Sequence, residues 1–461
     1  MTQKISNTIL EASFAENGGL SRIANSQAGE SYAIRADTFE VVTDLGHFNS
    51  EGVAPVACQD GEGWRHYEFD AGFCRITLEY RLVAGQAWLK RRLILTQLSQ
   101  RLVLQKIVLG RTQFDRAPAP FINYDTFWNA PTVGFLRFEK GGLFSGIENP
   151  FFATQHEGGT LALAFEPSLI LSPEETYESE FQFIGVYKPS GHMLSEHIPV
   201  TCHEPRPRFR NPNSYIPIDR AEVRVMQEFA RDYLALPPER FEFILYNFFF
   251  PLPQMPTAGS PEEAVHLKMI DTFDELDGDM IIFNPMDPYV LPTASMDSYW
   301  DLGPEGSAAE KIMNHAAQKG IRFGYYMGCA RHGEFGNAAA LPYVPEKSDW
   351  KKVDDTGTIA EENCMACDDY AEWFLAVQRN TISRFKLGLW SWDPGPGNGQ
   401  FCHSDQHGHL PGKGAYKGWR NSTALMRRLK ETFPGIYFQA FYGRKEYGLW
   451  GFKYFDQHES Y

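Results

Sequence analysis

Long apolar runs, an excess of basic residues and a regular cysteine pattern are all missing from this sequence. No stretch reaches the roughly 18 consecutive apolar residues of a membrane span, and the first residues lack the apolar run of a signal peptide. We therefore expect a cytoplasmic protein with no membrane partner. The 58 Asp and Glu residues outnumber the 43 Lys and Arg residues. The resulting net charge of -15 would repel phosphate backbones, so we expect no nucleic-acid partner.

Cysteine usage and length narrow the class of protein further. The seven cysteines are an odd number spread over 461 residues, which argues against a disulfide framework. At roughly 150 residues per domain, this length allows two or three domains. Hydrophobic residues make up 43% of the chain and aromatic residues 14%, enough for a large core. These properties predict a folded multidomain protein with a neutral or cationic small substrate, and they leave a homo-oligomer open.

The first 200 residues follow the period-two pattern of β-strands. In the run 73–82, Ile76, Leu78, Tyr80 and Leu82 share one face of the expected strand. Similar runs, separated by turn-forming residues, occur at 88–96, 102–109, 160–165 and 180–187. Many strands without helices predict an antiparallel β-sandwich. A proline-rich segment, 202–218, and a helical pattern, 220–234, are interpreted as a linker that ends this domain at about residue 235.

After residue 240 the pattern changes to apolar strand, loop and amphipathic helix in strict alternation. Ser260 and Pro261 form a helix start, and Val265, Phe273 and Leu276 are expected on its buried face together with Met269. The expected strands are 241–250, 280–283, 321–327, 386–392 and 436–441. The expected helices between them begin near residues 261, 308, 369 and 416. This alternation predicts a parallel sheet, and because no G-x-G-x-x-G motif follows the first strand, we favour a (β/α)8-type TIM barrel over 236–461.

Polar residues that directly follow these strands are the candidates for chemistry, because barrel enzymes build their sites there. They are Asn284, Asp287, Arg331, His332, Asp393, Gln439, Arg444 and Glu459. Asp393 stands out, since it ends a strand that carries two tryptophans, Trp390 and Trp392, which could lie against a sugar ring. The alternative is an aspartate that only opens a turn.

The sequence from Phe385 onward resembles the α-galactosidase and raffinose-synthase clan of retaining glycoside hydrolases. In that clan a strand ending in Trp-Asp is followed by a helix with a Phe-Pro step, here Phe433-Pro434, and by a Gly-Arg motif, here Gly443-Arg444. Weaker similarities occur upstream, at 320–326, 348–350 and in the turn 171–175. The resemblance implies a β-sandwich followed by a catalytic barrel, and a carbohydrate as the partner.

The same resemblance assigns roles to individual residues. It implies that Asp393 is the catalytic nucleophile and that Glu459 is the nearest candidate for the general acid. The substrate-binding residues that we expect are Asn284, Asp287, Trp390, Trp392, Gln439 and Arg444. The clan's Asp-Asp-Gly-Trp motif is replaced by 284–287, which puts galactose itself in question.

Other interpretations remain open at this point. Glu459 can instead be a terminal residue, because the chain stops where a sixth strand should end, and we expect a truncated barrel. A catalytically impaired carbohydrate-binding protein or a transglycosylase would keep the same fold. A different barrel enzyme, such as an isomerase, would need a phosphate site or metal ligands at the strand ends.

A zinc site is the last alternative. Cys364 and Cys367 form a CxxC motif, and His403, His407 and His409 lie downstream. The gap between the cysteines and the histidines is far longer than in a zinc finger. We therefore interpret the histidine-rich segment as a polar loop and expect no metal and no cofactor.

Overall fold

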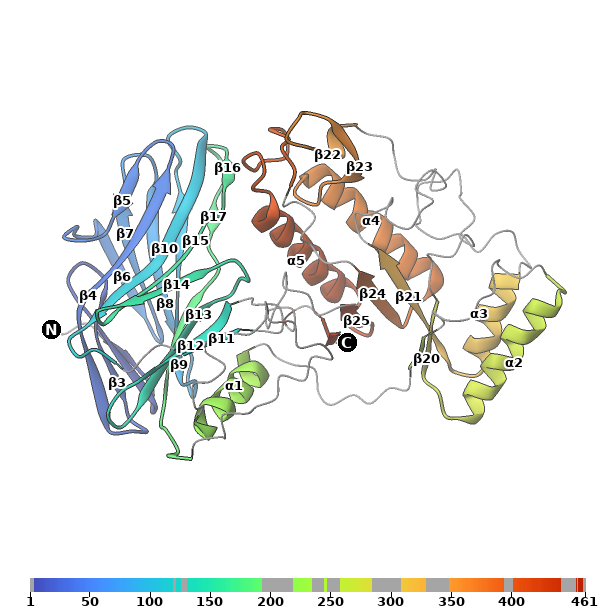
Figure 1. Cartoon of the computed structure of the whole chain (residues 1–461), viewed down its shortest axis with the longest axis horizontal. Helices are drawn as coiled ribbons and strands as arrows, with labels where there is room; N and C mark the ends of the chain where they lie inside the picture. The colour runs from blue at the N-terminus through green and yellow to red at the C-terminus, as the bar shows by residue number, and fades with distance from the viewer. Residues whose placement is uncertain are drawn as a thin grey trace. The chain divides into compact units, whose positions relative to one another are not determined.

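The computed structural model describes residues 4–118, 122–125, 131–192, 219–233, 244–246, 258–283, 308–328, 348–393, 401–440, 453 and 455–458. The chain divides into two compact units (Figure 1). The first takes most of its residues from Met1–Ala235 and the second from Leu236–Gly443.

The N-terminal unit contains two antiparallel sheets, each with nine strands among the described residues. In the first sheet the strand order is β1-β2-β3-β4-β10-β15-β14, with β5 beside β4 and β16 beside β10. Its strands are β1 (Lys4–Ser6), β2 (Leu10–Phe14), β3 (Leu20–Asn25), β4 (Glu30–Thr43), β5 (His47–Asn49), β10 (Leu102–Phe114), β14 (Ala153–Glu157), β15 (Thr160–Phe165) and β16 (Leu169–Leu171).

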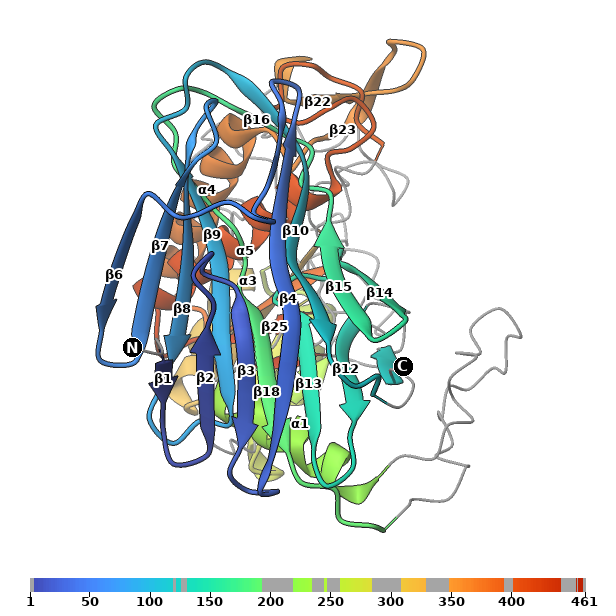
Figure 2. The ribbon, with the colours of Figure 1, turned by 90° about the vertical axis from the view of Figure 1, so that its left-hand side faces the viewer.

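The second sheet has the order β11-β12-β13-β18-β9-β8-β7-β6, with β17 beside β9. Its strands are β6 (Ala57–Gly61), β7 (Trp64–Asp70), β8 (Arg75–Leu82), β9 (Trp88–Thr96), β11 (Ile122–Asp125), β12 (Pro131–Arg137), β13 (Gly142–Ile147), β17 (Tyr177–Glu178) and β18 (Gln182–Tyr187). Figure 2 shows the long strands β4 and β10 side by side along the length of the unit.

The two sheets pack face to face around an aromatic core. Phe14 of β2 lies 4.7 Å from Tyr80 of β8, measured between ring centroids, and Phe39 of β4 lies 5.2 Å from Phe69 of β7. Each of these rings is at most 5% exposed. The four residues predicted to share one face of β8, Ile76, Leu78, Tyr80 and Leu82, are all buried. The prediction of an antiparallel β-sandwich in the first part of the chain is therefore confirmed.

A buried ion pair also crosses between the two sheets. Arg91 of β9 contacts Asp37 of β4 at 2.6 Å, and both side chains are at most 2% exposed. Asp37 also accepts a hydrogen bond from the Thr112 hydroxyl at 2.6 Å, and Arg91 donates to Gln182 at 2.7 Å. A Cβ at Gly110 would meet the guanidinium at 1.4 Å, so glycine leaves room for the arginine.

Helix α1 (Arg220–Tyr233) belongs to the same unit, and this corrects its interpretation as part of a linker. Phe229 is fully buried, with its ring centroid 4.5 Å from that of Phe183. Both carboxylate oxygens of Glu222 accept hydrogen bonds from Arg137 at 2.7 Å. A bidentate pair with a buried carboxylate and a buried aromatic ring attach this helix to the second sheet. The proline-rich segment 202–218 lies outside the described residues.

The second unit is built on a sheet in which every described pairing is parallel. The order is β19-β20-β21-β24-β25-β26, so the strands of this sheet lie side by side in the order in which they occur in the chain, as in a βα barrel. The strands are β19 (Ile244–Tyr246), β20 (Met280–Phe283), β21 (Arg322–Gly328), β24 (Leu389–Asp393), β25 (Tyr437–Ala440) and β26 (Gln457–His458). The helices are α2 (Pro261–Glu275), α3 (Ala308–Gln318), α4 (Asp368–Phe385) and α5 (Ala415–Thr432).

Helix α2 begins as predicted, but of the four residues expected on its buried face only Phe273 is buried. The Ser260 hydroxyl caps it by accepting from the backbone N–H of Glu263 at 3.2 Å. Val265 and Leu276 were expected inside, yet they are 52% and 59% exposed. The buried residues are Glu263, His266, Ile270 and Phe273. The spacing of apolar residues was misleading because the polar Glu263 and His266 take part in the inner face.

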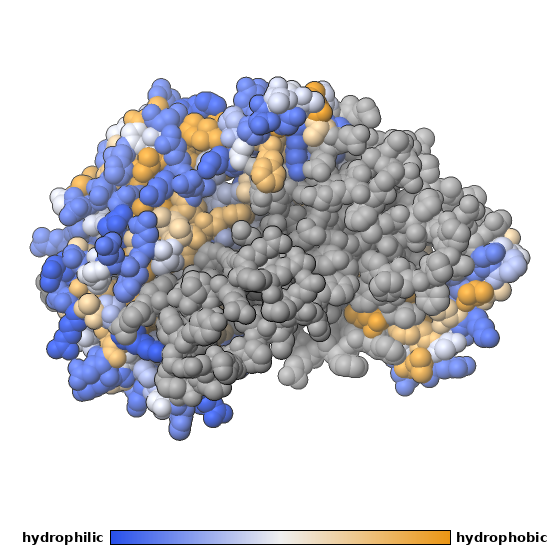
Figure 3. Space-filling view, viewed as in Figure 1, coloured by the Kyte–Doolittle hydropathy of each residue, from blue (hydrophilic) through white to orange (hydrophobic). Residues whose placement is uncertain are grey.

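Two observations concern the apolar length of the helices and the hydropathy of the surface. None of the described helices is long and apolar enough to cross a membrane. On the face that Figure 3 shows, the N-terminal unit carries many hydrophilic side chains with apolar ones in small groups between them.

Candidate functional site

Asp393 is the last residue of β24, and its backbone lies in register with Gly328 of β21. Strand β24 is parallel to both of its neighbours, β21 and β25. Asp393 therefore stands at the carboxyl edge of the parallel sheet, where the sequence analysis expected it. The side chains of Trp392 and Asp393 lie outside what the structure describes, as do Asn284, Asp287, Arg331, His332, Arg444 and Glu459.

Trp390 has a different role from the one expected. Its side chain is fully buried, and its ring N–H donates to the side-chain oxygen of Gln378 in α4 at 3.1 Å. Its ring also packs edge-on against Phe438 of β25, with 5.9 Å between centroids. Trp390 thus lies between the sheet and the helices, where it cannot touch a sugar. We correct the expectation that it binds substrate.

Gln439 lies on the face of β25 opposite to that of Phe438. It is fully buried and pairs in register with Ser391 of β24. Its neighbour Phe438 packs against Trp390 on the helix side, so the alternation of a strand puts Gln439 on the inner face of the sheet. Its role in substrate binding stays a prediction.

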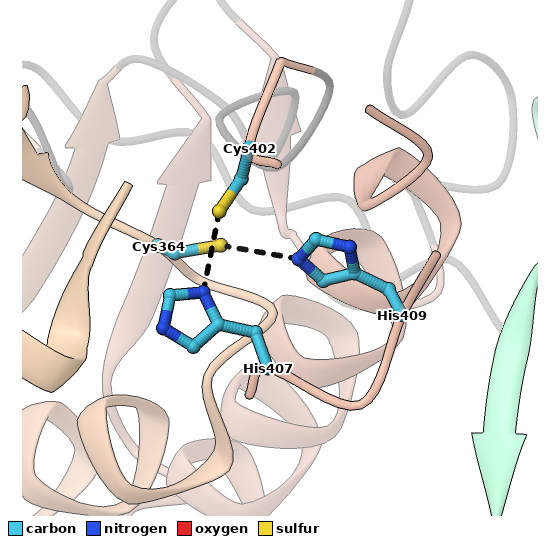
Figure 4. A group of neighbouring side chains, drawn as sticks. All are labelled: Cys364, Cys402, His407 and His409. Carbon is cyan, nitrogen blue, oxygen red and sulfur yellow. Dashed lines mark hydrogen bonds between the residues drawn. The ribbon is translucent and has the colours of Figure 1, made fainter. Parts of the chain in front are cut away.

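The structure also brings together four side chains, three of which the sequence analysis had considered as zinc ligands and then set aside. Cys364, Cys402, His407 and His409 each offer one ligand atom, and these four atoms all lie within 4.8 Å of one another (Figure 4). The sulfur of Cys402 lies 3.3 Å from Nδ1 of His407. The sulfur of Cys364 lies 3.8 Å from Nε2 of His409. All four side chains are at most 2% exposed.

The outer nitrogen of each histidine is held by a backbone carbonyl. Nε2 of His407 is 2.7 Å from the carbonyl oxygen of Asp349, and Nδ1 of His409 is 2.8 Å from that of Leu410. Because a carbonyl only accepts, each outer nitrogen carries the hydrogen and donates it. In a neutral ring the inner nitrogen then presents its lone pair to the cluster.

Local turns and backbone hydrogen bonds position the four residues. The 3-10 turn Ser348–Trp350 is followed by the hairpin β22 (Lys351–Val353) and β23 (Ile359–Asn363). The N–H of Cys364 donates to the carbonyl of Trp350 at 2.8 Å, directly before α4. Between the two histidines, Gly408 has a φ of +67°, a left-handed conformation that side chains disfavour. This turn lets neighbouring rings face one point.

Two of the residues that the sequence suggested as ligands do not belong to the cluster. The thiol of Cys367 is 3.9 Å from the carbonyl oxygen of Asp349. His403 has its backbone N–H bonded to the carbonyl of Val353 at 2.7 Å and is not a member of the four-residue cluster. Cys402 was not considered as a ligand, because the CxxC motif drew attention to Cys367 as the second cysteine. Cys402 could have been recognised as a ligand because it lies shortly before His407 and His409, a histidine pair two residues apart.

The electrostatics of the cluster follow from its two cysteines sharing one buried place. A hydrogen bond from Cys364, together with those from the two histidines, holds the pKa of Cys402 far below its usual range despite burial. The same hydrogen bond, and burial, raise the pKa of Cys364. Burial alone would lower the pKa of His407, but its bonds to Cys402 and to the carbonyl of Asp349 raise it. The arrangement therefore stabilises a thiolate at Cys402.

Comparison with known proteins gives a fold and no close relative. No protein-family model matches the chain, and no curated protein matches it significantly. An α-galactosidase from Lactobacillus brevis has a similar structure, with a TM-score of 0.64 and 12% identity over 99% of this chain and 72% of that one. A family 36 α-galactosidase from Geobacillus stearothermophilus, in complex with raffinose, gives 0.60 and 11% over 99% and 74%. In complex with stachyose it gives 0.58 and 11% over the same shares. The chain thus has the fold of family 36 glycoside hydrolases.

Proposed function

We propose that the protein is a retaining glycoside hydrolase that cleaves an α-linked, galactoside-like substrate with Asp393 as its nucleophile. The observation that carries this proposal is the position of Asp393 as the last residue of β24, between two parallel strands. Barrel enzymes carry out their chemistry at this edge of the sheet. The fold shared with α-galactosidases over 99% of the chain supports the same reading.

The mechanism that we propose uses two carboxyl groups. The Asp393 carboxylate attacks the anomeric carbon and forms a glycosyl-enzyme ester, while a second carboxylic acid protonates the leaving oxygen. Water then attacks the ester, and the second group accepts a proton from it. These groups stand about 5 to 5.5 Å apart in retaining enzymes. Glu459 is our candidate for the second group.

The substrate class is proposed from the structural neighbours. One neighbour has been seen with raffinose and with stachyose. We extend this to an α-galactosyl oligosaccharide or a sugar of similar shape. The buried amide of Gln439 on the inner face of the sheet supports a polar sugar-binding cavity, because an amide both donates and accepts hydrogen bonds with hydroxyl groups.

The test compares hydrolysis of an aryl α-galactoside by the wild type and by Asp393→Asn. Loss of the nucleophile should lower kcat by at least about a thousandfold. Asp70→Asn is the matched control, since Asp70 also ends a strand but carries an exposed side chain in the sandwich. Its kcat should be unchanged.

A second variant identifies the chemical role of Asp393. In Asp393→Gly, added azide can take the place of the carboxylate and should yield a glycosyl azide of inverted configuration. A wild type that binds α-galactosides without hydrolysing or transferring them would overturn the proposal and favour a carbohydrate-binding protein. Preferential transfer to an acceptor sugar would indicate a transglycosylase.

A further inference from the structure

We propose that Cys364, Cys402, His407 and His409 bind one Zn²⁺ ion in a closed tetrahedral site. The ion would join the segment that leads into α4 to the segment that leads into α5. This is a structural metal site, because four protein ligands leave no position for water or substrate. It is independent of the proposed glycosidase activity, and it goes against our expectation from the sequence that no metal binds.

The spacing of the ligand atoms fits a zinc ion. With Zn–S of about 2.3 Å and Zn–N of about 2.0 Å, tetrahedral geometry separates sulfur and nitrogen by about 3.5 Å. The two separations observed are 3.3 Å for Cys402 and His407, and 3.8 Å for Cys364 and His409. These values lie on either side of the ideal one. No ligand atom has to move far for all four to reach one ion.

The orientation of the histidines is a second, independent observation. Metal-binding histidines donate their outer N–H to a carbonyl or carboxylate, which turns the inner lone pair toward the metal. Both His407 and His409 do so, toward the carbonyls of Asp349 and Leu410. They even use opposite ring nitrogens, Nδ1 of His407 and Nε2 of His409, to face the same cluster. A polar loop would not require this match.

Burial and charge also favour an ion of this kind. Two thiolates balance the charge of Zn²⁺, so a closed site with two neutral histidines has no net charge. A neutral site can lie inside the protein, where an isolated charge would be costly. All four side chains are in fact at most 2% exposed. Two sulfur and two nitrogen ligands in a tetrahedron select zinc over the harder cations Mg²⁺ and Ca²⁺.

Two metal-free alternatives use the same side chains. In the first, the thiols share their hydrogens with the histidines as two Cys–His pairs. In the second, Cys364 and Cys402 join in a disulfide, although the structure has both as free cysteines. Neither alternative takes up a metal ion, so direct measurement of metal separates them from the proposal.

The place of the site in the fold shows what the ion would do. Cys402 comes nine residues after Asp393 in the chain. Lys417 in the first turn of α5 donates to the carbonyl of His407 at 3.0 Å and to Asp368 in α4 at 2.7 Å. The ion would thus hold together the start of α4, which precedes β24, and the start of α5, which follows it.

The experiment measures metal in the full-length protein, purified without a histidine tag. Elemental analysis and native mass spectrometry should find about one zinc ion per chain. Cys364→Ser and His409→Ala should each lose at least about nine tenths of it. The matched controls Cys367→Ser and His403→Ala change a cysteine and a histidine next to the cluster and should keep the full content.

A second measurement does not depend on whether the variants fold. Zinc is removed from the wild type by a chelator and replaced with Co²⁺. The expected result is the visible absorption of tetrahedral cobalt together with a thiolate-to-cobalt band in the near ultraviolet. A wild type that contains no zinc and shows no such spectrum would overturn the proposal. So would equal metal loss in the controls, or a Cys364–Cys402 disulfide in protein isolated under reducing conditions.

Discussion

The two units of this protein stabilise their buried polar side chains in different ways. In the sandwich, Arg91 and Asp37 neutralise each other across the two sheets at 2.6 Å. In the parallel unit, the four residues of the Cys/His cluster turn their ligand atoms toward one point and use backbone carbonyls only on the outside. The sandwich contains both partners of its interaction, whereas in the zinc proposal the cluster takes its central partner, the ion, from solution. Stability of the second unit should therefore depend on metal, and that of the first should not.

The largest expected effect tests the sandwich side of this comparison. Asp37→Asn keeps the shape of the side chain but leaves Arg91 buried without its counter-charge. Removing one partner of a buried pair costs about 3–5 kcal/mol. The free energy of opening is measured from hydrogen exchange of the slowest amides in β4 and β10.

An exposed ion pair of the same unit provides the control for Asp37→Asn. Glu139 lies 3.5 Å from Arg116, and both side chains are at least 70% exposed. Glu139→Gln should change the free energy of opening by at most about 1 kcal/mol. Similar losses in the two variants would show that the buried pair has no special importance for the sandwich.

The next prediction tests the other side and rests on the zinc proposal. Removal of the ion should speed hydrogen exchange in the first turn of α4 and in residues 401–414 by about tenfold, or about 1.4 kcal/mol of local stability. Amides in β4 and β10 should exchange at an unchanged rate in the same sample. Equal acceleration in both units would break the comparison, and no acceleration anywhere would mean that the ion does not stabilise this region.

The sequence predicted most of the fold because each element carries its own local signal. Strands such as β8 alternate in hydrophobicity, and α2 has a serine cap followed by proline. The buried face of α2 was wrong, since Glu263 and His266 are buried by tertiary packing that no apolar spacing reveals. For the same reason, local patterns predict where an element begins better than which side of it faces the core.

The residues of the candidate sites also differ in how far local sequence patterns could predict them. Asp393 could be placed because a strand end is a local feature. Trp390 could not, because the alternation of Trp390 and Trp392 with Leu389 and Ser391 does not say which face of the strand meets the helices. The zinc ligands could not be predicted as a set. The nearby CxxC motif drew attention to Cys367, while the partner that the fold brings to Cys364 lies 38 residues downstream.

The smallest expected effect concerns a charge that the sandwich unit satisfies with its own backbone. Asp219 is 2% exposed and precedes α1, where it accepts hydrogen bonds from the N–H groups of Ser190, Gly191 and Ala221. Burial opposes ionisation, but these bonds and the Ser190 hydroxyl outweigh it and hold the pKa of Asp219 below its ordinary value. Protons then bind the unfolded chain more readily than the folded one. The stabilisation is present above the unfolded pKa of about 3.9 and is lost as pH falls through the lower folded pKa.

Asp219→Asn removes this charge and keeps one oxygen that can cap the helix, although the N–H of Gly191 loses its carboxylate acceptor. At neutral pH the charge should account for about 0.3–1 kcal/mol of the stability that the variant loses, the usual interaction of a carboxylate with a helix N-terminus. The difference from the wild type should shrink below a pH of about 4, where the wild-type carboxyl becomes protonated in the unfolded chain and then in the folded one. The stability difference is measured by chemical denaturation at a series of pH values, followed through hydrogen exchange of the α1 amides. A difference that stays constant down to the lowest pH would show that hydrogen-bond geometry, and not charge, accounts for the role of Asp219.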